Sequence, residues 1–157
     1  MDEVTDLNEI FGSDKGGKGN KGGQRDRGAK GGQGGKRVLV VDDSLLFLKK
    51  IGAVLQQLGC EVDLAEDGAQ ALAKAGQHPP DLIVLDVMMP QKDGLDTLAE
   101  LRAQEAFSKT PVVMLTSKSD GNTVSRALSG QVVDYILKSS NPTDLLKRLR
   151  RQVEKLG

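Results

Sequence analysis

The stretch Val38-Leu39-Val40-Val41-Asp42-Asp43 decides the fold, because four apolar residues run directly into two acids. The same arrangement returns in Leu82-Ile83-Val84-Leu85-Asp86. Short runs that are apolar at every position are typical of strands buried on both faces of a parallel sheet. An acid that ends such a strand lies at the carboxyl edge of the sheet, which is where open α/β sheets bind their ligands.

Three carboxylates are therefore expected to gather at one edge, those of Asp42, Asp43 and Asp86. Two unit charges about 5 Å apart repel by about 3 kcal/mol at an effective dielectric constant of about 20. A divalent cation that prefers oxygen ligands, such as Mg²⁺, would relieve this repulsion, so the cluster predicts a metal site. The alternative is that each acid only caps the helix that follows it, as Asp often does.

Strand and helix patterns alternate five times after Lys36. The apolar spacing predicts strands at 37–41, 61–65, 81–85, 111–115 and 132–137, and helices at 44–58, 67–76, 95–104, 120–129 and 142–156. Because parallel strands are joined by right-handed crossovers, five βα units predict an α/β fold with a parallel sheet and helices on both faces.

The carboxyl ends of the later strands add a hydroxyl pair, Thr116-Ser117, and one cation, Lys138. This set suits phosphoryl transfer, in which a carboxylate attacks phosphorus and forms an acyl phosphate. A metal and a lysine ammonium would screen the charge on the transferred group. Asp86 is the predicted nucleophile, since its strand lies between the acid pair and Lys138.

The 157-residue chain has room for one ordinary domain and a tail. Its 22 basic and 22 acidic residues balance, which argues against a nucleic-acid binder as a whole. No apolar run approaches the roughly 20 residues that span a bilayer. The acidic N-terminus does not resemble a signal peptide. We therefore expect no membrane insertion and a cytoplasmic location.

Two segments precede the predicted domain at 36–157. Residues 12–35 are rich in Gly, Lys and Gln, a composition that predicts a disordered linker. Residues 1–11 place apolar side chains on one helical face and acids on the rest, which predicts a short docking peptide for a groove. Two alternatives are a disordered end with incidental apolar residues, and a basic linker that contacts nucleic acid or an anionic surface. The lack of aromatic residues in the linker disfavours the last.

From Lys36 to Gly157 the chain resembles the receiver domain of bacterial two-component response regulators. The resemblance covers about three-quarters of the chain and implies a flavodoxin-like sheet of five parallel strands in the order 2-1-3-4-5. The matching motifs, in chain order, are Val-Val-Asp42-Asp43-Ser, Leu-Asp86-Val-Met-Met-Pro90 with Asp93-Gly94 beyond it, Leu-Thr116-Ser117, and Asp-Tyr135-Ile-Leu-Lys138.

The resemblance implies how the acids and the lysine divide the chemistry. Asp86 would accept the phosphoryl group. Asp43, Asp86 and the backbone carbonyl of Met88 would bind Mg²⁺ directly, while Asp42 would act mostly through water. Lys138 would contact the phosphoryl group.

The resemblance also implies how the signal is passed on. Thr116 would move toward the phosphorylated acid, and Tyr135 would rotate inward behind it. A sensor histidine kinase would donate the phosphoryl group. The fourth helix, fifth strand and fifth helix would form the face that binds a downstream target protein, with residues 1–11 as a second contact.

The predicted function is that of a stand-alone response regulator, as in chemotaxis or motility. Such a protein catalyses its own phosphorylation and slow dephosphorylation without being an enzyme in the usual sense. Two alternatives are a phosphorelay intermediate, and an adaptor that keeps the receiver fold but binds partners regardless of phosphorylation. A phosphohydrolase is disfavoured, because that class usually has a second acid two residues after its nucleophile, where this chain has Met88.

One departure from the family pattern bears on the site. The lysine is usually followed by a proline in a cis peptide bond, but here Lys138 is followed by Ser139. Before a residue other than proline the cis form costs about 3 kcal/mol. We therefore expect the loop after Lys138 to be trans, mobile or strained, which would affect where the ammonium group lies.

Overall fold

The computed structural model describes residues 35–89, 92–117 and 120–156. The sequence-based predictions for residues 1–11 and for 12–35, apart from residue 35 itself, lie outside this part of the chain. In chain order the elements are β2 (Arg37–Val41), α3 (Leu45–Gln57), β3 (Glu61–Ala65), α4 (Gly68–Gln77), β4 (Leu82–Leu85), α5 (Gly94–Ala103), η2 (Glu105–Phe107), β5 (Val112–Thr116), α6 (Gly121–Ser129), β6 (Asp134–Leu137) and α7 (Pro142–Glu154).

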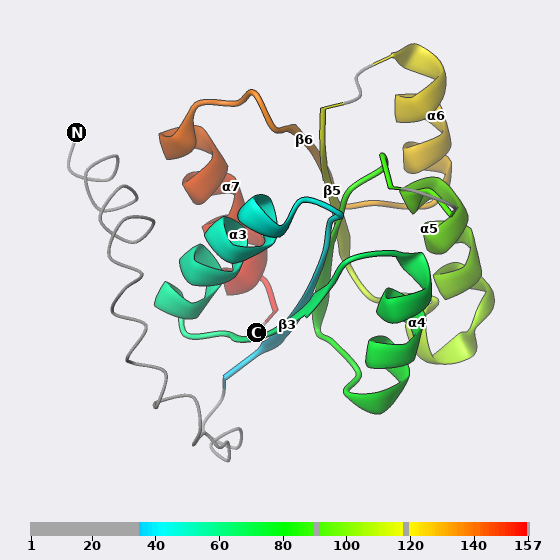
Figure 1. Ribbon diagram of the computed structural model, residues 1–157, viewed down its shortest axis with the longest axis horizontal. Helices are drawn as coiled ribbons and strands as arrows, with labels where there is room; N and C mark the ends of the chain where they lie inside the picture. Colours follow the sequence, from blue (N-terminus) through cyan, green and yellow to red (C-terminus); the bar gives the residue numbers. More distant parts are fainter. Residues whose placement is uncertain (1–34, 90–91, 118–119, 157) are drawn as a thin grey trace.

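The five strands form one sheet with the order β3-β2-β4-β5-β6, and every neighbouring pair is parallel. Numbered along the chain, this order is 2-1-3-4-5. Helices cover both faces of the sheet, α3 and α7 on one and α4, α5 and α6 on the other (Figure 1). The predicted fold class is therefore confirmed.

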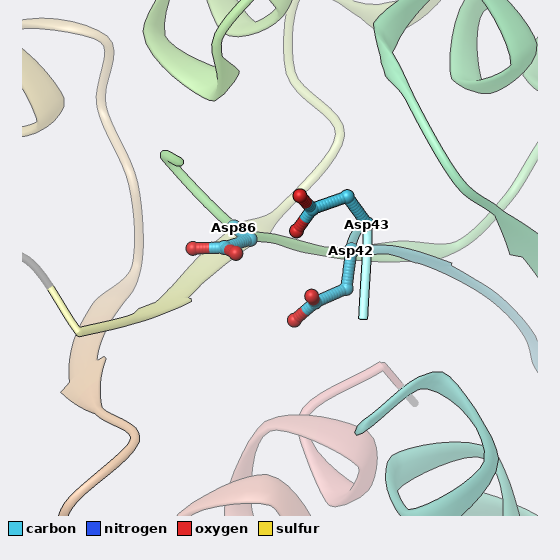
Figure 2. A group of neighbouring side chains, drawn as sticks. All are labelled: Asp42, Asp43 and Asp86. Carbon is cyan, nitrogen blue, oxygen red and sulfur yellow. The ribbon is translucent and has the colours of Figure 1, made fainter. Parts of the chain in front are cut away.

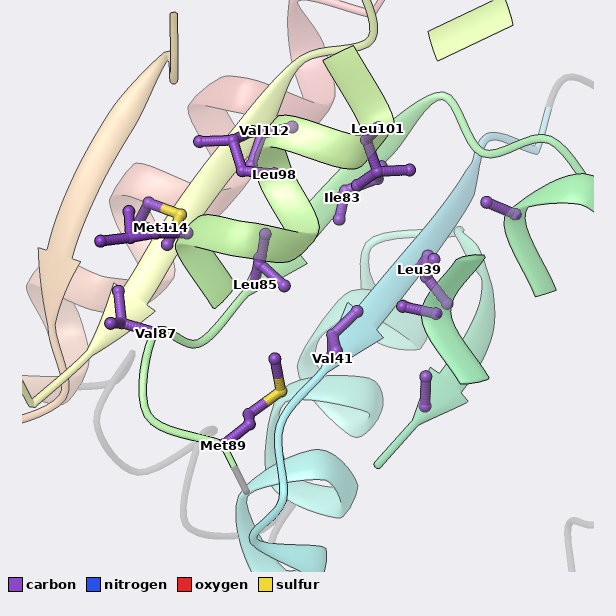
Figure 3. Close-up of a cluster of buried hydrophobic side chains, with 14 of the residues drawn as sticks. Leu39, Val41, Ile83, Leu85, Val87, Met89, Leu98, Leu101, Val112 and Met114 are labelled. Carbon is purple, nitrogen blue, oxygen red and sulfur yellow. The ribbon is translucent and has the colours of Figure 1, made fainter. Parts of the chain in front are cut away.

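The sheet has one hydrophobic cluster on each face. Each strand contributes side chains to both clusters, because its side chains alternate between the two faces. Val38 and Val40 of β2 pack with α3 and α7, whereas Leu39 and Val41 pack with α4, α5 and α6. Figure 3 shows the second cluster between the sheet and its helices. All four residues are almost fully buried, which explains why the run is apolar at every position.

The helices begin at side-chain caps, as short polar residues before an apolar run predict. Ser44 caps α3 by accepting a hydrogen bond from the N–H of Phe47, and Asp93 caps α5 by accepting one from Asp96. The caps of these two helices are thus not Asp42, Asp43 or Asp86. The reading of the three acids as simple helix caps is wrong.

Element boundaries agree with the sequence prediction to within two residues. The last strand starts at Asp134 and not at position 132, because Gln131 adopts a positive φ of 63° in a turn that follows α6. The short helix η2 was not expected from the sequence. In the described part of the chain, no helix is both long and apolar enough to cross a bilayer.

Candidate functional site

The strand register brings the two acidic motifs to the same level of the sheet. Val41 pairs with Leu85, so Asp42 and Asp86 follow at adjacent positions on neighbouring strands. The N–H of Asp86 donates to the carbonyl of Val41 at 2.9 Å, and the N–H of Asp42 donates to the carbonyl of Ala65 at 3.0 Å. The backbone of each acid is therefore fixed by the ladder that the preceding apolar run builds.

The carboxylates of Asp42, Asp43 and Asp86 form the predicted cluster. One oxygen from each lies within 4.8 Å of the other two. Figure 2 shows the three side chains next to one another. Asp42 and Asp86 are each only 3% exposed, whereas Asp43 is exposed to solvent. Clustered carboxylate oxygens of which one is open to solvent fit a hard cation such as Mg²⁺.

Lys138 supplies the positive charge next to this cluster. Its Nζ lies 2.7 Å from Oδ2 of Asp42 and 3.1 Å from Oδ2 of Asp86. Its backbone N–H donates to the carbonyl of Thr116 at 2.9 Å, which fixes the end of β6 beside β5. The ammonium also lies 4.5 Å from the centre of the Phe47 ring, a cation–π distance.

The bond between Lys138 and Ser139 is trans, since no cis peptide occurs among the described residues. Of the three expectations for this loop, the trans form is the one observed. The N–H of Ser140 donates to the carbonyl of Leu137 at 2.9 Å and closes a turn. The ammonium of Lys138 reaches the acids across this turn, so the serine does not remove it from the site.

Burial and mutual charge set the pKa values in the site. Burial raises the pKa of Asp42 above its ordinary value, and the nearby charge of Asp86 adds to the rise, although hydrogen bonds from Lys138 and Ser44 oppose it. Burial lowers the pKa of Lys138, but its hydrogen bond to Asp42 and the charges of both acids outweigh that effect and raise it. The ammonium of Lys138 therefore stays charged, whereas ionisation of the Asp42 carboxyl costs free energy in the folded protein.

Backbone groups complete the contacts of the two buried acids. The N–H of Ser44 donates to Oδ1 of Asp42 at 2.9 Å, and the N–H of Met88 donates to Oδ1 of Asp86 at 3.2 Å. The side chain of Met88 is half exposed, and the hydroxyl of Ser117 lies 3.6 Å from its sulfur. The side chain of Met88 thus lies at the rim of the site.

The loop after Asp86 is held by a very close approach of Gly94. A Cβ atom at Gly94 would lie only 1.9 Å from the carbonyl oxygen of Asp86 and 2.9 Å from Cα of Val87. The N–H of Gly94 donates to the carbonyl of Val87 at 2.8 Å. Only a residue without a side chain fits here, so Gly94 fixes the backbone that carries the predicted nucleophile.

Comparison with known proteins identifies the family. Residues 38–150 match the family model of the response regulator receiver domain. The chain belongs to this family. It is 37% identical over 120 residues to Protein PilG of Pseudomonas aeruginosa, a match that covers 74% of this chain and 87% of PilG.

Other relatives and solved structures agree with this assignment. The DNA-binding response regulator MtrA of Mycobacterium tuberculosis is 37% identical over 120 residues, which are 76% of this chain and 51% of MtrA. The chain thus spans about half the length of that relative. The chemotaxis response regulator CheY4 of Vibrio cholerae superimposes with a TM-score of 0.69 at 35% identity, covering 74% of this chain and 98% of CheY4.

Receiver domains generally bind Mg²⁺ at an acidic pocket and interact with histidine kinases and downstream targets. In this receiver domain the acidic pocket is the cluster of Asp42, Asp43 and Asp86. The pocket consists of carboxylates at the ends of parallel strands with a lysine beside them, a set of groups that suits Mg²⁺ binding. The donor set fits a hard divalent cation, and the bridging Lys138 fits a negatively charged phosphoryl group.

The two predicted switch residues lie on the strands that flank the site. Thr116 is the last residue of β5 and is fully buried. Tyr135 pairs with Met114 in the middle of β6 and is half buried against the core on the side of α4, α5 and α6. Burial raises the pKa of Tyr135, and the charges of Asp120 and Asp86 raise it further, which places the phenol within electrostatic reach of the site.

Sequence reasoning missed two residues that shape the site of this receiver domain. Phe47 was not singled out, although its ring lies beside the ammonium of Lys138. Its distance of 91 positions from Lys138 leaves no local signal. Gly94 was noted only as part of a motif, and the clash that a Cβ would cause becomes visible only once β4 and α5 are placed.

Proposed function

We propose that this receiver domain is a phosphorylation switch. Asp86 takes a phosphoryl group from a sensor histidine kinase in a Mg²⁺-dependent reaction, and the phosphorylated form binds a downstream target protein. The observation that carries the proposal is the position of Lys138 Nζ, 3.1 Å from the carboxylate of Asp86 and beside two further acids. The exchange takes place in the cytoplasm.

The chemistry follows from the groups around Asp86. A carboxylate oxygen of Asp86 forms a new P–O bond while the P–N bond to the donor histidine breaks, and the released imidazole takes a proton from water. Lys138 holds the oxygens of the phosphoryl group through its ammonium, which its raised pKa keeps charged. Asp42, Asp43, Asp86 and the carbonyl of Met88 would hold Mg²⁺, which neutralises charge that builds up on the phosphoryl oxygens.

The signal leaves the site through β5 and β6. The hydroxyl of Thr116 moves to a phosphoryl oxygen, and Tyr135 rotates inward into the space behind it. Tyr135 lies on β6 between α6 and α7, so this movement changes the face that these three elements form. We assign target binding to that face, and slow hydrolysis of the acyl phosphate resets the switch.

The test is to incubate the full chain with acetyl phosphate and Mg²⁺ and to record its intact mass. We expect the gain of one phosphoryl group, which is lost when Mg²⁺ is removed with a chelator. Asp86→Asn is the matched control, because an amide has nearly the shape of the carboxylate but cannot form the acyl phosphate. It should gain nothing.

A second outcome would favour another class of function. If protein that is folded by circular dichroism gains no phosphoryl group from acetyl phosphate or from a histidine kinase, the switch is excluded. The chain would then be an adaptor that keeps the receiver fold and binds partners regardless of phosphorylation. A phosphoryl group that passes from Asp86 to a histidine of another protein would instead identify a phosphorelay intermediate.

A further inference from the structure

A shallow groove runs between α3 and the edge strand β3, away from the acidic site. It has a volume of about 370 Å³. Its surface is mainly apolar, contributed by Leu48, Gly52, Ala53, Val62 and Leu64. Gly52 gives the groove its depth, since a Cβ there would already contact Leu64 at 3.4 Å and Val62 at 3.7 Å. β3 pairs with β2 alone, so no further strand of the described sheet covers this side.

The chain enters the fold at one end of this groove. The turn at residues 58–60 joins α3 to β3, the two elements that line the groove. The N–H of Glu61 donates to the carbonyl of Lys36 at 2.8 Å, and Gly35 lies against the carbonyl of Gly59. Residue 35, where the described part of the chain begins, therefore lies beside the turn that joins the two elements lining the groove.

The sequence of residues 1–11 complements the groove in pattern and in charge. Four apolar residues share one helical face, and three acids lie on the opposite side: Val4, Leu7, Ile10 and Phe11, with Asp2, Asp6 and Glu9. The fourth acid, Glu3, lies one turn before Leu7 on the apolar side. The helix that forms one wall of the groove carries Lys49 and Lys50 and no acid. Lys49 also lines the groove itself and is exposed.

We propose that residues 1–11 bind in this groove as a short helix, within the same chain. Eleven helical residues are about 17 Å long, and the 13 residues of α3 extend over about 20 Å, so a helix of residues 1–11 fits along α3. Residues 12–34 provide a 23-residue connection, and a Gly-rich chain of that length spans about 25–30 Å on average. The segment can therefore reach every part of the groove from residue 35.

The tether makes such binding effective even if the segment alone binds weakly. Eleven residues are too few for a stable helix in water, so the helix forms only where its apolar face is buried. A short flexible connection gives a local concentration of about 1 mM, which half-fills a site with a Kd of about 1 mM. A partner that binds residues 1–11 would at the same time uncover the α3–β3 groove. The segment therefore couples the exposure of its own apolar face to the exposure of the groove.

The test compares two double variants of the full, uniformly ¹⁵N-labelled and unphosphorylated chain by NMR. Leu7→Asp with Ile10→Asp places charges on the apolar face of the segment. Thr5→Asp with Asn8→Asp adds the same charge at the same spacing, at positions outside the apolar face, and is the matched control. We expect the amide signals of groove residues, such as Gly52 and Val62, to move in the first variant and to keep their wild-type positions in the control.

A second pair of variants tests the groove from the other side. Lys49→Glu should move the same amide signals toward the positions seen in the first double variant, whereas Lys147→Glu, an exposed lysine on α7, should leave them unchanged. Spectra of the two double variants that coincide at all groove amides would overturn the proposal. Groove shifts that disappear on dilution would also overturn it, because they would mean that the segment binds a second copy. Both results are independent of whether Asp86 is phosphorylated.

Discussion

The two edges of the sheet hold similar arrangements of charge with different surroundings. At the amino edge, the guanidinium of Arg37 lies 2.7 Å from Glu61 and 3.2 Å from Asp63. At the carboxyl edge, the ammonium of Lys138 lies 2.7 Å from Asp42 and 3.1 Å from Asp86. The three side chains at the amino edge are 22–32% exposed, whereas at the carboxyl edge the side chain of Lys138 is 20% exposed and the side chains of its two partner acids are 4% exposed.

The two edges have similar ion-pair distances and differ in how deeply the acids are buried. At the amino edge water screens the charges, so each contact contributes little and leaves nothing to be compensated. At the carboxyl edge the buried Asp42 and Asp86 share one lysine, and the exposed Asp43 lies beside them, so negative charge is left over. A divalent cation can compensate that remaining negative charge.

The largest expected effect is that of Lys138→Met, which keeps the length of the side chain but removes the charge. The buried carboxylates of Asp42 and Asp86 would then face each other without a cation, and we expect the free energy of unfolding to fall by about 3 kcal/mol. Urea unfolding without divalent ions measures this loss. Added Mg²⁺ should restore part of it, because the ion replaces the missing charge.

The control for this change is Lys147→Met, which removes an exposed lysine of α7. We expect it to alter the free energy of unfolding by less than about 0.5 kcal/mol. Equal losses for the two lysines would contradict the idea that burial makes the carboxyl edge different.

Gly94→Ala displaces the buried acid without changing any charge. Its Cβ would collide with the carbonyl of Asp86, so the loop must move, and we expect a loss of about 2 kcal/mol in unfolding free energy together with slower phosphorylation by acetyl phosphate. Gly76→Ala in α4 is the matched control, because nothing lies within 4 Å of its Cβ position. That variant should gain about 0.5–1 kcal/mol.

Most of the fold could be predicted from the sequence because local patterns determine it. The apolar run of β2 indicates that the strand is buried on both faces, and the short polar residues before the helices indicate where the helices begin. Strand ends also place Asp42 and Asp86 at one edge, so the residues of the cluster could be named in advance. Their roles in metal binding and phosphorylation remain predictions.

What the sequence could not supply depends on contacts between distant segments. Arg102 donates to the carbonyls of Phe107, Thr110, Gly130 and Gln131, and so joins the ends of α5 and α6. No spacing rule connects an arginine to four carbonyls in two loops. The same holds for Phe47 beside Lys138, since α3 and β6 meet only after the sheet has formed.

Asp42→Asn removes one negative charge from the carboxyl edge. Burial raises the pKa of Asp42 above its ordinary value of 3.8, so the folded state holds this proton more tightly than the unfolded state. Ionisation therefore lowers stability as the pH rises through the raised value. Without Mg²⁺, the variant should be more stable than the wild type at neutral pH.

The pH dependence provides the check on this prediction. Below about pH 3.8 the carboxyl is protonated in both states, and the advantage of Asp42→Asn should disappear. Excess Mg²⁺ should stabilise the wild type more than the variant, since the ion uses the charge that the variant lacks. A variant that is less stable than the wild type at neutral pH without Mg²⁺ would contradict the excess of negative charge.

The smallest effect is expected at the amino edge, from Arg37→Met. The substitution removes both ion pairs, but the contact of the backbone N–H of residue 37 with Asp81 stays, as does most of the apolar stem. Because the partners are partly solvated, we expect a loss of less than about 1 kcal/mol in unfolding free energy. High salt should shrink this loss, since mobile ions screen exposed pairs far more than buried ones. A loss as large as that of Lys138→Met, and insensitive to salt, would mean that ion-pair distance alone decides the cost, and the distinction between the two edges would fail.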